Sequence, residues 1–241
     1  MKMKYTLLAI LLLLTTVTLH GQRRRGNGTI VTDTRPIENF TQLKVSGAFK
    51  VQITTENSDV IKITTDENLL PYIVTKVNAA GELSIRRKKG VILKPSKGNS
   101  IRIEIPHQAL SMIALSGSGS ISSAKDIETS ASNIHLSGSG FIDLSLMNTS
   151  TEVNNAGSGS VRLSGSTQKL EVAQSGSGAV ILDQLAAENA HAHLAGSGEI
   201  RLWATKVLDA AVSGSGRIRY KDTPTAKIKT KIVGSGNIRP F

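Results

Sequence analysis

Apolar and polar residues alternate along most of this chain, and the alternation keeps phase with a recurring Gly-Ser-Gly motif. A typical copy is "LSGSGFIDL" at residues 136–144. The first glycines of the seven copies are Gly117, Gly138, Gly157, Gly176, Gly196, Gly214 and Gly234, with gaps of 21, 19, 19, 20, 18 and 20. A period near twenty residues is typical of a solenoid, in which each repeat packs only against its neighbours.

The apolar residues occupy fixed places relative to each motif. The position four residues after the first glycine is β-branched in every copy: Ile121, Ile142, Val161, Val180, Ile200, Ile218 and Ile238. The position four residues before the glycine is mostly apolar, and so is the position two before it, where Asn155 and Gln174 are exceptions. Because strand side chains alternate with a period of two, these positions share one face. We therefore predict an all-β fold, a parallel β-helix with coils of about twenty residues.

Both glycines of each motif share the phase of the apolar column. A strand that bends there would bring inward side chains into collision, and glycine lacks the Cβ that would collide. The second glycines of this predicted turn are Gly119, Gly140, Gly159, Gly178, Gly198, Gly216 and Gly236. The serines between the glycines face the opposite way and are our candidate binding surface, an exposed ladder of Ser118, Ser139, Ser158, Ser177, Ser197, Ser215 and Ser235.

Residues 37–110 alternate like strands but lack the regular repeat. "SGAFKV" at 46–51 resembles a degenerate copy of the motif, and "DENLLPYI" at 66–73 predicts a short helical turn. We expect this segment to be an N-terminal continuation or cap of the solenoid, whose open end needs cover. No linker separates it from the repeats at 111–241, so residues 37–241 are predicted to form a single domain.

The first 22 residues have the layout of a secretory signal peptide. Lys2 and Lys4 precede an apolar run from Leu7 to Leu14 that is short for a membrane span. We therefore predict export to the periplasm, the outer-membrane surface or the extracellular medium, with no transmembrane span in the mature chain. Residues 23–36, basic and glycine-containing, are predicted to be a flexible leader. The chain has no cysteine, which excludes disulfides and lipoprotein acylation.

The formal charge of +11, or +9 without Lys2 and Lys4, favours anionic partners such as acidic glycans. Two basic runs stand out, Arg23–Arg25 and Arg86–Lys89, and their simplest interpretation is a solvated tail and a hairpin tip. The chain has only eight aromatic residues (one Trp, three Tyr and four Phe) for stacking on bases. We expect no nucleic-acid partner.

Motifs for catalysis or cofactor binding are not found. The glycines are not followed by the Gly-Lys-Ser/Thr of a P-loop, and the turns lack the aspartates of calcium-binding repeats. "HAH" at 191–193 places two imidazoles on one strand face, and His135 and His107 stand alone; we interpret these as surface or strand-end histidines. We predict no catalytic residues, no cofactor and no metal site.

Two other chemistries remain open alternatives. Some β-helix enzymes cleave acidic polysaccharides with charged residues on one outer face, and the residues that could share such a face are Asp143, Glu152, Arg162, Glu171 and Asp183. Successive backbone N–H groups in a Gly-Ser-Gly turn could form a small anion-binding nest, unless they bond to water or to the next coil.

The predicted signal peptide, the "FKVQI" strand at 49–53 and the serial xSGSGxI repeats ending in "GSGNI" resemble the "putative auto-transporter adhesin, head GIN domain" family, and the resemblance covers about residues 37–238. The resemblance, to a family common among exported proteins of the Bacteroidetes, implies a β-helical protein with an adhesive role and no catalytic residues.

The function predicted from these features is that of a non-enzymatic surface or periplasmic interaction module. Its expected partners are anionic glycans or other cell-envelope components. The alternatives are a polysaccharide lyase or hydrolase on the same scaffold, and a structural envelope protein that self-associates through its solenoid ends.

Overall fold

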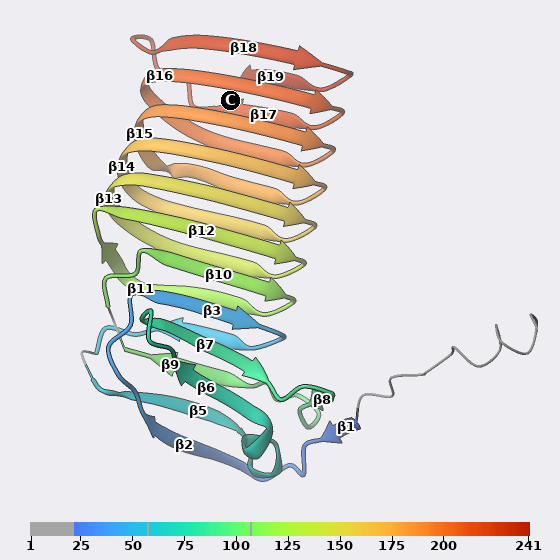
Figure 1. Ribbon diagram of the computed structural model, residues 1–241. Helices are drawn as coiled ribbons and strands as arrows, with labels where there is room; N and C mark the ends of the chain where they lie inside the picture. Colours follow the sequence, from blue (N-terminus) through green and yellow to red (C-terminus); the bar gives the residue numbers. More distant parts are fainter. Residues whose placement is uncertain (1–21, 57, 107) are drawn as a thin grey trace, which may run out of the picture.

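The alternating segments form strands along nearly the whole chain in the computed structural model, which describes residues 22–56, 58–106 and 108–241 (Figure 1). The elements of the N-terminal part are β1 (Gln22–Arg25), β2 (Ile30–Pro36), β3 (Gln42–Ser46), β4 (Lys50–Ile53), β5 (Val60–Asp66), the 3-10 helix η1 (Glu67–Tyr72), β6 (Ile73–Val77), β7 (Glu82–Arg87), β8 (Val91–Lys94) and β9 (Arg102–Ile105). Those of the repeats are β10 (Met112–Gly117), β11 (Ser120–Glu128), β12 (Ala131–Gly138), β13 (Phe141–Gly157), β14 (Ser160–Gly176), β15 (Ala179–Gly196), β16 (Glu199–Gly214), β17 (Arg217–Tyr220), β18 (Lys227–Val233) and β19 (Asn237–Pro240).

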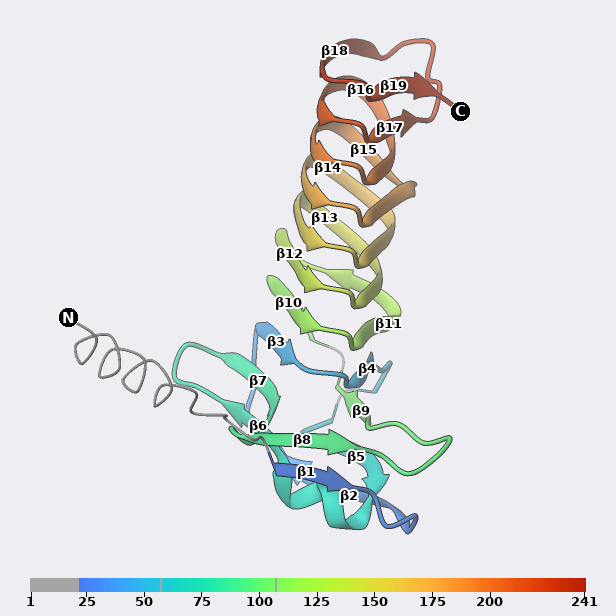
Figure 2. The ribbon, with the colours of Figure 1, turned by 90° about the vertical axis from the view of Figure 1, so that its right-hand side faces the viewer.

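The repeats form a parallel β-solenoid, as predicted. The first glycines of successive motifs pair directly, Gly138 with Gly157, then Gly176 and Gly196. The chain bends at each motif and returns along the opposite side of the stack (Figure 2). The strands that precede each Gly-Ser-Gly motif form one side of the stack, and we call their outer surface the entry face. The strands that follow each motif form the other side, and we call their outer surface the exit face.

The predicted apolar column forms the spine of the interior. Ile142, Val161 and Val180 are paired in register and have no exposed surface. Burying each such side chain stabilises the fold by about 1.5–3 kcal/mol. Because each coil buries its column against the coils above and below, the repeats stabilise one another.

The two polar exceptions in this column, Asn155 and Gln174, are also buried, and they contact each other. Asn155 Nδ2 donates to Gln174 Oε1 at 2.7 Å and to the carbonyl of Gly159 at 3.1 Å. A hydrogen-bonded amide pair thus replaces the leucines found at this place in neighbouring coils, and the partnership limits the cost of burying the amides.

The glycines of each motif meet two separate requirements. All seven first glycines have φ between +104° and +122°, a conformation that L side chains rarely adopt. The second glycine has no positive φ but faces inward: a Cβ on Gly159 would lie 2.7 Å from the carbonyl oxygen of Gly140. The first glycine is therefore needed for its backbone conformation and the second for close approach of successive coils.

The N-terminal part both continues and caps the solenoid. Strands β3 and β4 form a coil beneath β10 and β11, and Gly47, with φ +130°, holds the place of a first glycine. Strands β7 and β9 continue the parallel pairing one step further. Strands β2, β5 and β6 then pair antiparallel with β5, β9 and β7 respectively, and close this end. The short helical turn predicted at 66–73 is η1.

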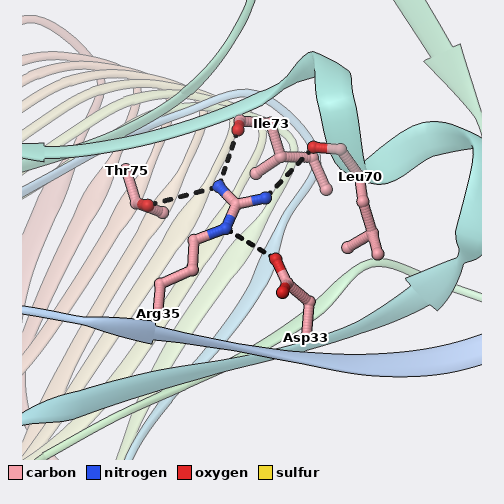
Figure 3. A network of polar contacts seen from close by, with 5 residues as sticks. All are labelled: Asp33, Arg35, Leu70, Ile73 and Thr75. Carbon is pink, nitrogen blue, oxygen red and sulfur yellow. Dashed lines mark hydrogen bonds and ion pairs between the residues drawn. The ribbon is translucent and has the colours of Figure 1, made fainter.

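The structure differs from the predicted flexible leader at residues 23–36, which form β1 and β2. All seven residues of β2 pair with β5. The guanidinium of Arg35 adds a second connection, since it donates to Asp33 Oδ2 at 2.7 Å and to the carbonyls of Leu70 and Ile73 at 3.1 and 2.8 Å (Figure 3). The predicted signal peptide lies outside the described residues, except that Gln22 begins β1.

The C-terminal end of the stack is open. Among the described strands, β18 pairs with β16 alone, and all of its residues are exposed, including the apolar Ile228, Ile232 and Val233. The two ends of the solenoid are therefore unlike, one closed by antiparallel strands and one bearing a free strand edge. Self-association through these ends stays a prediction.

Candidate binding surfaces

The serine ladder runs along the bend of the stack. All seven motif serines are exposed. At five of these turns the serine N–H donates to a carbonyl of the preceding coil, namely at Ser139, Ser158, Ser177, Ser197 and Ser215. For example, Ser158 N and Gly159 N both donate to the carbonyl of Gly138, at 3.0 and 2.9 Å. The anion-nest alternative is therefore wrong for these turns, because the N–H groups join one coil to the next. The serine hydroxyls remain available to a ligand, and their binding role stays a prediction.

A column of arginines follows the motif on the exit face. In register, the side chains are Arg162, Ile181, Arg201, Arg219 and Arg239. Next to this column, the Glu199 carboxylate forms ion pairs with three guanidinium groups, at 2.9 Å from Arg201 Nε, 3.4 Å from Arg217 Nε and 4.0 Å from Arg219 Nε, and Arg201 Nε donates a hydrogen bond to it. One carboxylate thus faces three cations, so the tip of the exit face carries a surplus of positive charge.

The ionisation of Glu199 reflects this arrangement. Partial burial acts to raise the pKa of its carboxyl, but the hydrogen bond from Arg201 and the charges of Arg201, Arg217 and Arg219 outweigh burial, and the pKa is lowered. Glu199 is therefore ionised at neutral pH, where it orients the guanidinium groups without neutralising the cluster.

A polar groove lies where the serine ladder meets this cluster. Its volume is about 200 Å³, and its lining includes Ser197, Ser215, Ser235, Arg217 and Asn237. The hydroxyls come from three successive coils, which are about 4.8 Å apart in a sheet. The groove, which we call the tip groove, therefore offers hydroxyl, amide and guanidinium groups to one ligand.

The charged residues considered for polysaccharide cleavage fall into two sets on opposite faces of the solenoid. Asp143 and Arg162 pair with each other on the exit face, where the charge of Asp183 also acts on Arg201. Glu152 and Glu171 pair on the entry face, on the other side of the solenoid. The bend between the halves of β13 and of β14 reverses the chain and places the two sets apart.

The entry face has its own groove, of about 320 Å³, lined by Glu152, Glu171, His191, His193 and Asp209 among others. His191 pairs with Glu171 on one side and Asp209 on the other. Within the described ranges, no group of three or more histidine, cysteine or acidic side chains is arranged to hold a metal ion. His107 lies outside the described residues.

The base of the molecule gathers both basic runs. Strand β1 pairs in parallel with β8, just after β7 and Lys88, so that residues 69 positions apart lie side by side (Figure 2). Arg24 and Lys88 both lie over the ring of Tyr72, at 5.1 and 5.9 Å from its centroid. From the sequence, the two basic runs were predicted to be a solvated tail and a hairpin tip, because nothing in either run indicates that β1 pairs with β8.

Asp66 fixes the loop that leads from β1 to β2. Its carboxylate is buried and accepts hydrogen bonds from Gly28 N at 2.8 Å and Ser96 N at 3.0 Å. Burial acts to raise the pKa of this carboxyl, but the hydrogen bonds from Ser96 and Gly28 outweigh it, and the pKa is lowered. Ionised Asp66 therefore ties β1 and the loop after β8 to the end of β5.

Replacing Asp66 with asparagine is expected to lower the free energy of unfolding at pH 7 by about 1.5–3 kcal/mol, the range for hydrogen bonds to a charged group. Since the folded-state pKa is lowered, this stabilisation is present above the unfolded-state pKa near 3.9 and is lost as pH falls through the folded value. Urea unfolding of wild type and Asp66→Asn at pH 7 and pH 3 measures it. The difference should shrink at pH 3; an equal difference at both pH values, or an equal loss in the exposed control Glu38→Gln, would contradict this role.

These features define a capped parallel β-solenoid whose candidate sites are grooves on its edges and faces. The chain belongs to the family described as "putative auto-transporter adhesin, head GIN domain", which matches residues 39–224. No curated protein matches the chain. Throughout the described part, no helix has the length and hydropathy needed to cross a membrane.

Solved structures of similar proteins have the same fold. A putative adhesin from Bacteroides fragilis is 25% identical with a TM-score of 0.81, over 90% of this chain and 100% of that one. A putative lipid binding protein from Parabacteroides distasonis is 27% identical with a TM-score of 0.77, over 91% and 100%. A putative adhesin from Parabacteroides merdae, 20% identical with a TM-score of 0.67 over 91% and 99%, shares the fold.

Proposed function

We propose that this protein is an exported, non-enzymatic adhesion module of the cell envelope that binds an acidic glycan in the tip groove. The observation that carries the proposal is the meeting of the serine ladder with Arg217 in one groove, beside arginines that share a single carboxylate. The adhesin names of the family and of several neighbours support a surface or exported location. The predicted signal peptide points the same way.

The chemistry of the groove suits a sugar that carries a carboxylate or a sulfate. A guanidinium binds such a group through two parallel hydrogen bonds, and the Arg217 side chain is 53% exposed and therefore accessible. Serine hydroxyls both donate and accept, as sugar hydroxyls do. Ser197, Ser215 and Ser235 repeat along the stack, so successive sugars of an extended chain would meet equivalent groups.

Binding without catalysis in the tip groove is favoured by the acid-free lining of that groove. Glycoside cleavage usually needs two carboxyl groups about 5–9.5 Å apart on either side of the bond. Among the described residues, the lining of the tip groove contains no aspartate or glutamate, and the acidic residues of the entry-face groove lie on another surface of the solenoid.

The test compares Arg217→Gln with Arg102→Gln, two arginines at opposite ends of the same outward column. Both variants lose one charge. We expect Arg217→Gln to weaken binding of polygalacturonate about tenfold, which corresponds to about 1.4 kcal/mol, while Arg102→Gln binds as wild type does. Calorimetric titration at 50 and 300 mM salt measures both, with neutral dextran as the uncharged polymer.

Two results would overturn the proposal. Equal losses in both variants, with all binding gone at high salt, would show attraction by net charge rather than by the groove. Binding of dextran as tight as that of polygalacturonate would remove the role of the guanidinium. Both variants should keep the thermal stability of wild type, since exposed ion pairs contribute only about 0–1 kcal/mol.

A further inference from the structure

An apolar groove lies at the base of the molecule, between β8 and the bend of the lowest Gly-Ser-Gly coils. Its volume is about 350 Å³, within the range of about 300–1,000 Å³ typical of small-molecule sites. Phe49 and Ile101, both nearly fully buried, form its deep part, and Ile92, Leu93 and Pro95 line it from β8 and the following loop. Ile92 is 43% exposed, so a branched apolar side chain of this groove contacts water.

Arg87 brings a positive charge to the lining of this base groove, and three further cations are its neighbours in the chain or lie across the β1–β8 ladder. Arg87 lines the groove, and its Nη1 donates to the carbonyl of Val91, which holds the guanidinium at the edge. Lys88 and Lys89 follow it in the chain, and Arg23 pairs with Ile92 across the β1–β8 ladder. None of the ion pairs between described residues involves any of these four cations.

We propose that the base groove binds a single-chain anionic amphiphile, with an alkyl chain against Phe49, Ile92 and Pro95 and a phosphate or carboxylate head on Arg87. An apolar chain alone would leave the guanidinium with its carbonyl contact but no anionic partner, and a small anion alone would leave Ile92 in water. An amphiphile satisfies both at once, because it removes apolar surface from water and supplies the missing negative charge.

The shape of the site favours one separate molecule over a membrane surface. The deep part is formed by Phe49 and Ile101, whose exposed fractions are 2% and 4%, whereas Ile92 is 43% exposed. A chain that reaches Phe49 must therefore leave its bilayer or micelle, whereas a surface contact would involve the rim alone. The site is distinct from the tip groove, which lies among the last coils of the stack.

The probe is dodecyl phosphate below its micelle-forming concentration, titrated calorimetrically into the full chain. Inorganic phosphate supplies the head alone, and dodecyltrimethylammonium supplies the same chain with the opposite charge. The variants are Ile92→Thr and Arg87→Gln. Their matched controls are Ile228→Thr, a strand isoleucine that is 40% exposed at the other end of the stack, and Arg102→Gln.

We expect dodecyl phosphate to bind wild type and both controls equally, and Ile92→Thr and Arg87→Gln each to weaken it about tenfold or more, a change readily resolved in Kd. Equally tight binding of dodecyltrimethylammonium would show adsorption of surfactant and overturn the proposal. So would equally tight binding of inorganic phosphate, or unchanged affinity in Ile92→Thr with an unchanged melting temperature. Unaltered polygalacturonate binding in Ile92→Thr would separate this site from the glycan site.

Discussion

Replacing Gly157 with alanine is expected to destabilise the solenoid by about 2–6 kcal/mol, the sum of two costs of about 1–3 kcal/mol each. The first is conformational, because Gly157 has φ +122°. The second is steric, because the added Cβ would lie 2.6 Å from the carbonyl oxygen of Gly138. That oxygen accepts the N–H groups of Ser158 and Gly159 and cannot move away without breaking the link between coils.

Three alanine variants separate these costs in denaturant unfolding experiments. Gly159→Ala carries only the steric cost, since its Cβ would lie 2.7 Å from the carbonyl oxygen of Gly140. Gly90→Ala carries only the conformational cost, because φ is +77° and no atom lies within 4 Å. Ser158→Ala, at an exposed position, carries neither. Gly157→Ala should be the least stable of the four, and a Gly157→Ala protein as stable as Ser158→Ala would contradict the account of the bend.

The solenoid was predictable from sequence because its register repeats. Each coil places β-branched residues four positions after the first glycine, and Ile142, Val161 and Val180 pair in that order in the structure. A single alternating strand leaves its partner undetermined, whereas seven phased copies specify the same neighbour each time. The buried Asn155–Gln174 pair was visible as an interruption of the column but not as a hydrogen bond.

The cap was less predictable because its contacts are not periodic. Strand β2 pairs with β5, and Arg35 reaches carbonyls of η1 and β6 about 35 residues later. Nothing in the basic, glycine-containing composition of residues 23–36 indicates those partners. The same limit applies to β1 and β8, whose pairing joins the two basic runs and creates the base groove.

The arginine column, in contrast, had a signal in the sequence. Arg162, Arg201, Arg219 and Arg239 all lie five residues after a first glycine, one place beyond the apolar spine. The spine and the serine ladder were predicted from the register, whereas this outward position was not included in the prediction. An outward column of like charge repeated along a solenoid is a surface that the period alone can reveal.

Replacing Val180 with aspartate is expected to destabilise the protein by at least about 4 kcal/mol, from lost apolar burial and an unpaired buried carboxylate. Val180 has no exposed surface and lies between Val161 and Ile200 in the spine, where no cation can reach it. This loss is comparable with the total stability of many proteins, about 5–15 kcal/mol. Circular dichroism during thermal unfolding measures it.

The matched control is Ile181→Asp, one residue further along the same strand. Ile181 faces outward and lies between Arg162 and Arg201 in the arginine column. The same substitution there places a carboxylate beside two guanidinium groups in water-accessible surroundings, so we expect a change within about 1 kcal/mol of wild type. A large loss in Ile181→Asp, or a small one in Val180→Asp, would show that inward and outward positions are assigned wrongly. Because the two sites are adjacent in sequence, they differ mainly in the direction in which the side chain points. The assignment of the buried spine and of the outward binding face depends on this same alternation.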